Sequence, residues 1–210
     1  MKINKIFITI ILMLSNFLFA QDWKDLGFKA LKNNDYGNAI LYYTKAIEID
    51  PGDDNSFTNR ALAYSELKDY SNAINDFTYA LNMNPTDPVI AYNSRGLVYY
   101  KLNQHDKAVE DYTNAIKFNS KHRIAYYNRG LALKKLKRYN EAVEDYSKAI
   151  ELGLKAPLVY YSRALAYRQL MKNRESSDDF NEYLKLNGNK DNDAEEIREQ
   201  IKALGFEPKY

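Results

Sequence analysis

The sequence has no cysteine and only two histidines among its 210 residues. Without cysteine there are no disulfides, thiolate metal sites, cysteine nucleophiles or acylated cysteine anchors. The histidines, His105 and His122, do not form a metal-binding pattern. There is also no G-x-S-x-G motif and no glycine-rich phosphate loop, the signatures of serine hydrolases and nucleotide-binding proteins. We therefore expect a protein that is not an enzyme and has no metal or cofactor.

Most of the chain also has a net charge of zero, because its basic and acidic residues balance. Lys2 and Lys5 are the only charged residues among the first twenty, so the rest of the chain carries 28 basic and 28 acidic groups. Proteins that bind nucleic acid gain affinity by neutralising phosphates and usually carry a basic excess. We therefore expect no nucleic acid partner. Because the sequence shows no catalytic motif, we also expect no small-molecule substrate.

One apolar run precedes the balanced part of the chain. It covers residues 6–20, follows the two lysines and ends where the chain turns polar at Gln21. The run is shorter than the roughly 20 residues of a spanning helix, and its layout is typical of a signal peptide. Because Leu18 stands where a small residue is usual before a cleavage site, an uncleaved membrane anchor is the alternative. We predict that residues 1–20 are a signal peptide and that the protein is periplasmic or secreted, with membrane contact only if this segment is uncleaved.

An internal repeat of 34 or 35 residues organises the rest of the sequence. A column of small residues is followed four positions later by a column of aromatic residues and three positions after that by a further column of mostly small residues. The first two columns are Ala39, Ala73, Ala108, Ala142 and Ser176, and Tyr43, Phe77, Tyr112, Tyr146 and Phe180. This spacing places all three columns on one stripe of a helix, which we predict to be the second helix of each repeat.

The first helix of each repeat has its own column of small residues, namely Gly27, Ala61, Gly96, Gly130 and Ala164. Turns as short as Lys68-Asp69 separate the two helices and force them to run antiparallel. Pro51 and Pro85 close the first two repeats, because proline cannot continue a helix. We predict an all-α fold with five repeats within residues 21–188, at about 20–53, 54–87, 89–122, 123–156 and 157–190.

The segments at residues 126–133 (YYNRGLAL) and 141–150 (EAVEDYSKAI) resemble tetratricopeptide repeats, and the resemblance covers about residues 20–188. It implies a right-handed α-solenoid of five helix-turn-helix repeats. The end repeats depart from the pattern, with Leu26 in place of an arginine and Ser176 in place of an alanine, as expected of terminal repeats.

A further helix is expected at residues 191–205, followed by a tail at 206–210. Asp193 and Glu196 have the spacing of a capping box, Ile197 and Ile201 lie on one apolar stripe, and Gly205 ends the helix. Such an amphipathic helix would cover the open apolar end of the repeats.

Two polar columns recur together in repeats two to five. They are Arg60, Arg95, Arg129 and Arg163 in the first helices, and Asp76, Asp111, Asp145 and Asp179 in the second helices. In an antiparallel hairpin whose turn lies midway between them, an arginine and an aspartate of one repeat face each other. We interpret the columns as four structural ion pairs. The alternative is an arginine ladder that binds an acidic ligand.

The resemblance also implies a binding groove, because first helices line a concave surface that holds a peptide or helix in this family. Asparagines can hydrogen-bond a peptide backbone, while tyrosine and leucine supply apolar contacts. Carried over position by position, the groove residues are Asn55, Asn59, Asn93, Tyr100, Tyr127, Asn128, Leu131, Lys134, Tyr161 and Arg168. The family's chaperone-binding clamp is incomplete: Lys24 and Asn59 fit it, whereas Phe28, Ile90 and Ser94 replace its other polar members.

We therefore predict a non-catalytic scaffold of the cell envelope that binds an unidentified partner protein or peptide in its groove. The alternative is a structural subunit of an envelope assembly that uses its convex face or its capping helix. His105 occupies a turn column otherwise filled by tyrosine and is expected to pack as a ring. His122 lies in a junction beside Lys121 and Arg123 and is expected to be solvated.

Overall fold

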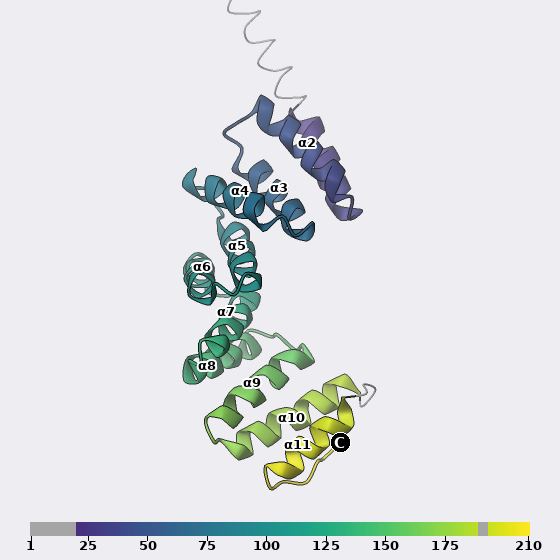
Figure 1. Ribbon diagram of the computed structural model, residues 1–210, viewed down its shortest axis with the longest axis vertical. Coiled ribbons are helices and arrows are strands. Elements are labelled where there is room, and N and C mark those ends of the chain that lie inside the picture. The colour runs from purple at the N-terminus through teal and green to yellow at the C-terminus, as the bar shows by residue number, and fades with distance from the viewer. Residues whose placement is uncertain (1–19, 189–192) are drawn as a thin grey trace, which may run out of the picture. The chain divides into compact units, whose positions relative to one another are not determined.

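A computed structural model describes residues 20–188 and 193–210, and all regular secondary structure in these ranges is helical. Apart from residue 20, the predicted signal peptide lies outside the described residues. A first helix covers residues 20–32. The helices that follow are α2 (Tyr36–Ile49), α3 (Asp54–Glu66), α4 (Tyr70–Asn82), α5 (Val89–Lys101), α6 (His105–Phe118), α7 (Arg123–Lys135), α8 (Tyr139–Glu151), α9 (Pro157–Gln169), α10 (Asn173–Asn187) and α11 (Ala194–Ala203), as labelled in Figure 1.

These helices belong to two units, one ending at Val98 and the other beginning at Tyr99, with the boundary inside α5. In the first unit, α3 packs against α2 and α4. In the second, each helix from α6 to α11 packs against the next. Sequence neighbours are therefore spatial neighbours within each unit, which is how repeat proteins bury their apolar faces. The predicted all-helical repeat fold is confirmed.

The turns inside the hairpins share a left-handed residue. Asn34, Lys68, Asn103, Lys137 and Met171 all have φ between 58° and 62°. In the first two hairpins the second helix begins two residues later, and an aspartate caps it: Asp35 and Asp69 each accept a hydrogen bond from the backbone N–H three residues ahead. Such a cap satisfies one of the free donors at a helix start. Turn and cap together fix the antiparallel hairpin.

The core of each repeat surrounds the aromatic residue of its second helix, which is at most 1% exposed in all five repeats. In repeats one and four, where this residue is tyrosine, the facing first helix carries glycine. A Cβ added to Gly27 would lie 2.9 Å from the ring of Tyr43, and one added to Gly130 would lie 2.7 Å from the ring of Tyr146. Glycine therefore makes room for the larger ring.

Alanine takes the place of glycine where the aromatic residue is phenylalanine. Ala61 packs in one cluster with Phe77, and Ala164 packs in another with Phe180. A first-helix glycine thus accompanies the larger tyrosine ring, and a first-helix alanine accompanies the smaller phenylalanine ring. The two combinations fill about the same volume. Dense filling of this kind is what makes core volumes hard to change.

Burial of the core tyrosines predicts a loss of stability in alkali. Desolvation raises the pKa of Tyr43 to about 12 and raises the pKa of Tyr112 and Tyr146 as well. In the unfolded chain tyrosine ionises near pH 10, so the folded state keeps its protons to higher pH. The stability that the folded protein gains from keeping these tyrosines protonated is complete below pH 10 and is lost as the pH rises above it. We expect the free energy of unfolding to fall by about 1.4 kcal/mol per pH unit for each such tyrosine.

Urea denaturation between about pH 8 and pH 12 measures this slope. The Tyr146→Phe variant removes one ionising group from the core and is expected to show a shallower slope by one proton. Lysines titrate in the same range but are the same in both proteins. An unchanged slope in the variant would contradict the assignment of this effect to Tyr146.

The last helix, α11, packs against α10. Ala194, Ile197 and Ile201 form one apolar cluster with Phe180 and Leu184. The predicted capping box is wrong, because Asp193 has helical backbone angles and its side chain makes no capping hydrogen bond. A capping side chain reaches the first free N–H groups from a non-helical backbone.

The end of α11 is fixed by its turn and by the tail. Gly205 has φ 87°, the left-handed conformation that favours glycine. The backbone N–H groups of Gly205 and Phe206 donate to the last turn of the helix. The backbone N–H of Lys209 donates to the side chain of Asn181 on α10 at 2.7 Å. The tail therefore returns to α10 and is held there.

Candidate functional site

Three of the predicted arginine–aspartate pairs form within their hairpins. Arg60 donates from Nε and Nη2 to the two carboxylate oxygens of Asp76, at 2.7 and 2.9 Å. The corresponding distances are 2.7 and 2.7 Å between Arg129 and Asp145, and 2.7 and 2.8 Å between Arg163 and Asp179. Two parallel charge-assisted hydrogen bonds are the strongest arrangement for such a pair. Arg95 and Asp111 belong to different units, and their pairing stays a prediction.

Each of the four arginines also contacts the preceding repeat. Its Nη1 donates to a hydroxyl on the second helix of that repeat. The acceptors are Thr44 for Arg60 at 3.0 Å, Thr78 for Arg95 at 2.8 Å, Thr113 for Arg129 at 3.1 Å and Ser147 for Arg163 at 2.9 Å. We call this arrangement the arginine clasp. It joins a hairpin to the repeat before it.

These four hydroxyl residues were not predicted as a column, although their spacing of 34 or 35 residues is visible in the sequence. In a complete clasp, such as that of Arg129, three of the five guanidinium N–H groups are bonded within the chain. The guanidinium is also largely buried, with 21% of the side chain exposed. This geometry favours the interpretation as structural ion pairs over an arginine ladder that binds an acidic ligand.

The first repeat has no clasp. Leu26 and Tyr42 occupy the positions of the arginine and the aspartate, and Trp23 stacks on Tyr42 with ring centroids 5.8 Å apart. Lys24, which fits the chaperone clamp of the family, instead pairs with Asp53 at 3.1 Å. The ammonium that such a clamp needs is therefore already engaged.

The predicted groove residues divide between the two units. Asn55 and Asn59 on α3 and Asn93 on α5 belong to the first unit. The other seven belong to the second unit. The residues that share one face of its first helices are Tyr100, Tyr127, Leu131, Lys134 and Tyr161, which we call the tyrosine face.

All five side chains of the tyrosine face are half-buried. The ring of Tyr127 lies 5.9 Å from that of Tyr146, and the ring of Tyr161 lies 5.9 Å from that of Phe180. Burial raises the pKa of Tyr100, and the neighbouring Tyr127 adds to the effect. Tyr127 and Tyr161 therefore rest on core rings, and all three tyrosines remain partly exposed.

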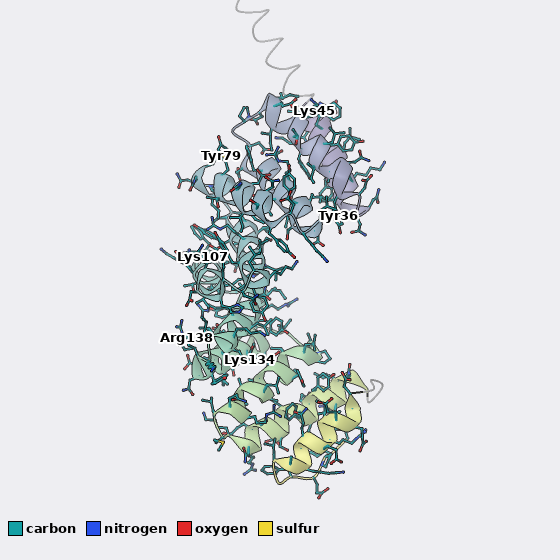
Figure 2. The ribbon with its side chains drawn as sticks, viewed as in Figure 1. Tyr36, Lys45, Tyr79, Lys107, Lys134 and Arg138 are labelled. Carbon is teal, nitrogen blue, oxygen red and sulfur yellow. The ribbon has the colours of Figure 1, made fainter. Side chains whose placement is uncertain are left out.

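Lys134 is the cation of the tyrosine face and is labelled in Figure 2. It is half-buried and makes no ion pair with any residue that the structure describes. Burial lowers the pKa of Lys134, and the adjacent Lys135 lowers it further. A partly desolvated ammonium without a carboxylate favours the approach of an anion.

The other two predicted groove residues of the second unit differ from Lys134. Arg168 occupies the equivalent position one repeat later, where its Nη1 donates to the side chain of Gln200 on α11 at 2.8 Å. Asn128 is half-buried on α7 and already has an interaction within the protein. Lys134 is thus the groove cation that is open to a partner.

The histidines have structural roles. The ring of His105 packs 5.2 Å from that of Tyr100, as predicted. The prediction that His122 is solvated was wrong, because its Nδ1 accepts the backbone N–H of Ala125 at 3.1 Å and caps α7.

Among residues 20–188 and 193–210, no group of acidic or histidine side chains could hold a metal ion. In the same ranges, no helix has both the length and the apolar character to cross a membrane.

Comparison with known proteins places these features in a family. Family models described as tetratricopeptide repeat match residues 29–53, 42–75, 89–122 and 124–152, together more than half of the chain. Over 67 residues the chain is 42% identical to small glutamine-rich tetratricopeptide repeat-containing protein 2 of Saccharomyces cerevisiae, covering 32% of this chain and 19% of that protein. Over 70 residues it is 36% identical to heat shock protein STI1 of the same yeast, covering 33% and 12%. The chain thus spans a fifth or less of these relatives.

Solved structures extend the likeness to most of the fold. MamA from Desulfovibrio magneticus RS-1, residues 41 to its end, matches with a TM-score of 0.75 and 18% identity over 82% of this chain and 97% of that chain. YrrB, described as a TPR protein with an unusual peptide-binding site, matches with a TM-score of 0.69 and 17% identity over 80% and 86%. At these identities the likeness concerns the fold alone. From the repeats, the clasps and the family matches together, the chain belongs to the tetratricopeptide repeat family.

Proposed function

We propose that the protein is a non-catalytic scaffold that binds a segment of a partner protein on the tyrosine face. The observation that carries this proposal is Lys134, a half-buried cation without an ion pair in the described part of the chain, on the same face as three tyrosines. The partner segment would place a carboxylate against Lys134 and apolar side chains against the rings. Binding surfaces are enriched in aromatic anchors such as tyrosine, and charge complementarity with the partner adds specificity.

The relatives support this reading in general terms. YrrB is described as having a peptide-binding site, and its fold resembles that of this chain. The curated relatives carry similar repeats within longer proteins, so their partners are not transferred here. For location, we propose export to the cell envelope, which rests on the signal-peptide layout of residues 1–20.

The test is capture of the partner by the full chain, tagged at its C-terminus and produced in the native cell. Fractionation and the mass of the tagged protein report its location and whether the leader is removed. We expect the envelope fraction to hold the protein together with a partner. A Tyr127→Ala/Lys134→Ala variant is expected to lose that partner about 100-fold, because hot-spot aromatic and charged residues dominate binding energy.

A matched variant, Tyr79→Ala/Lys117→Ala, removes one tyrosine and one lysine from exposed positions elsewhere. It is expected to retain the partner. Equal retention by both variants would contradict binding on the tyrosine face and would favour the convex face or α11. A cytosolic location would contradict the proposed export without affecting the binding site.

A further inference from the structure

The turns of the second unit carry an excess of positive charge. The seven residues before the small-residue column of repeats three, four and five are residues 101–107, 135–141 and 169–175. They contain seven basic and three acidic residues. The basic residues are Lys101, Lys107, Lys135, Lys137, Arg138, Lys172 and Arg174, and all seven are exposed.

The equivalent positions of the first unit do not share this excess. Residues 32–38 and 66–72 contain the two basic residues Lys32 and Lys68 and three acidic residues. Both units have a left-handed residue in each turn, but the capping aspartates of the first unit are replaced in the second by Gln104, Arg138 and Lys172, which make no capping hydrogen bond. The positive charge is therefore a property of the second unit and not a requirement of the hairpin.

The basic turns lie on one edge of the second unit. Hairpins that follow one another with the same order of helices place their turns on the same side. Figure 2 shows Lys107 and Arg138, from successive turns, on the same side of this unit. Hydrogen bonds to Glu141 raise the pKa of Arg138, and Asp106 of the preceding turn adds to the effect. Successive turns are thus electrostatic neighbours.

Several of these cations are free to bind a partner. Among the described residues, Lys135, Lys137 and Arg174 make no ion pair. Lys107 and Lys172 lie over the rings of Tyr99 and Tyr167, with Nζ 5.3 and 5.9 Å from the ring centroids. Both ammonium groups remain exposed. The edge therefore presents positive charge with few internal partners.

An apolar residue stands at the tip of the last of these turns. Met171 is 84% exposed, more than any other large hydrophobic residue in the described ranges. Its φ of 59° lies in the left-handed region, which asparagine occupies in the equivalent turns at Asn34 and Asn103. Asparagine tolerates this conformation better than methionine does. Neither burial nor backbone preference accounts for methionine here, whereas contact with an apolar phase does.

We propose that this basic edge, with Met171 at its tip, binds the surface of a membrane rich in anionic phospholipids. The lysines and arginines contact the phosphates, and Met171 enters the headgroup region. Stable peripheral attachment generally needs such a pair of signals, basic and apolar together. This attachment goes beyond the proposed function, and it differs from the prediction that membrane contact requires the N-terminal segment.

The same observations favour a lipid surface over other polyanions. A nucleic acid strand uses open aromatic rings for stacking, but the rings of Tyr99 and Tyr167 beside this edge are covered by lysines. An acidic protein would satisfy the cations, yet a methionine that is 84% exposed on a tight turn gains most where an apolar layer lies beneath the charges. We therefore commit to the membrane surface.

The test is co-sedimentation of the protein, purified from its native cells, with lipid vesicles. We expect binding to phosphatidylcholine vesicles that contain roughly 30% phosphatidylglycerol, and much weaker binding to phosphatidylcholine alone. A Lys135→Glu/Lys137→Glu variant is expected to bind the anionic vesicles at least about tenfold more weakly. The Lys32→Glu/Lys68→Glu variant makes the same charge change at the equivalent positions of the first unit and is expected to bind normally.

Met171→Asn separates folding from binding. Asparagine suits the left-handed turn, so this variant is expected to melt no lower than the wild type while binding anionic vesicles about threefold more weakly. Equal loss in the two lysine variants would overturn the proposal, since it would indicate a general charge effect. Equal binding to neutral and anionic vesicles would also overturn it, because attachment through residues 6–20 does not depend on lipid charge. The proposal would also be overturned if the Lys135→Glu/Lys137→Glu variant lost an acidic protein partner while its binding to vesicles stayed intact.

Discussion

Replacement of Asp145 by alanine is expected to lower the free energy of unfolding by about 3–5 kcal/mol. The side chain of Asp145 is only 6% exposed and accepts both hydrogen bonds of the Arg129 fork. Removal of the carboxylate leaves a largely buried guanidinium without a counterion, which costs more than the pair itself contributes. Denaturation followed by circular dichroism measures the change.

Two variants show whether the loss comes from the unpaired charge. Glu141→Ala removes an exposed carboxylate that Arg138 holds in the same bidentate way, and it is expected to have little effect. Arg129→Met/Asp145→Leu removes both charges of the buried pair and is expected to recover most of the stability. If Asp145→Ala melted like the wild type while partner capture fell, the arginines would be a ligand-binding ladder instead.

Replacement of Gly130 by alanine is expected to cost about 2–3 kcal/mol, although alanine is the better helix former by about 1 kcal/mol. The new Cβ would lie 2.7 Å from Cε1 of Tyr146. That ring is completely buried, so it can move away only by displacing other core residues. A net loss of stability means that the steric conflict exceeds the gain in helix propensity.

Two other repeats of the same chain show a pair of residues that avoids this steric conflict. Repeats two and five combine alanine with phenylalanine at these positions, so Gly130→Ala/Tyr146→Phe is expected to recover much of the loss. Without its hydroxyl, the ring can shift into the space that the oxygen occupied. A double-mutant cycle measures the coupling between the two sites. If the two effects were simply additive, the complementarity of glycine and tyrosine would have no energetic basis.

The fold was predictable because its signals recur in every repeat. Small and aromatic columns fix which face of each helix is buried, and the short turns leave only antiparallel hairpins. The arginine and aspartate columns were recognised because they recur together in repeats two to five. The hydroxyls of Thr113 and Ser147 were missed because their partners lie in the next repeat, and pairing by hairpin symmetry considers only residues of one repeat.

Features that occur once were harder to predict. The capping role of His122 depends on a backbone turn that presents Nδ1 to the N–H of Ala125. The expected cap at Asp193 failed because that residue already has helical backbone angles and its side chain makes no capping hydrogen bond. Within the candidate site, the residue types were predictable from the sequence. Which of the two groove cations, Lys134 or Arg168, has no partner among the described residues was not predictable. Arg168 is engaged by Gln200 of α11, a contact 32 residues away in sequence, whereas Lys134 has no such partner.

The arginine clasp also bears on how cooperatively the protein unfolds. Arg163 is bonded at once to Asp179 in its own hairpin and to Ser147 in the preceding one. Unfolding of the last hairpin would break the bond from Arg163 to Ser147 of the preceding repeat together with the pair to Asp179. Nearest-neighbour coupling of this kind makes adjacent repeats melt together, so that a partly unwound array is rarely populated. The first repeat, with Leu26 in place of the arginine, lacks an arginine–aspartate pair inside its own hairpin and is joined to the second repeat by the bond from Arg60 to Thr44.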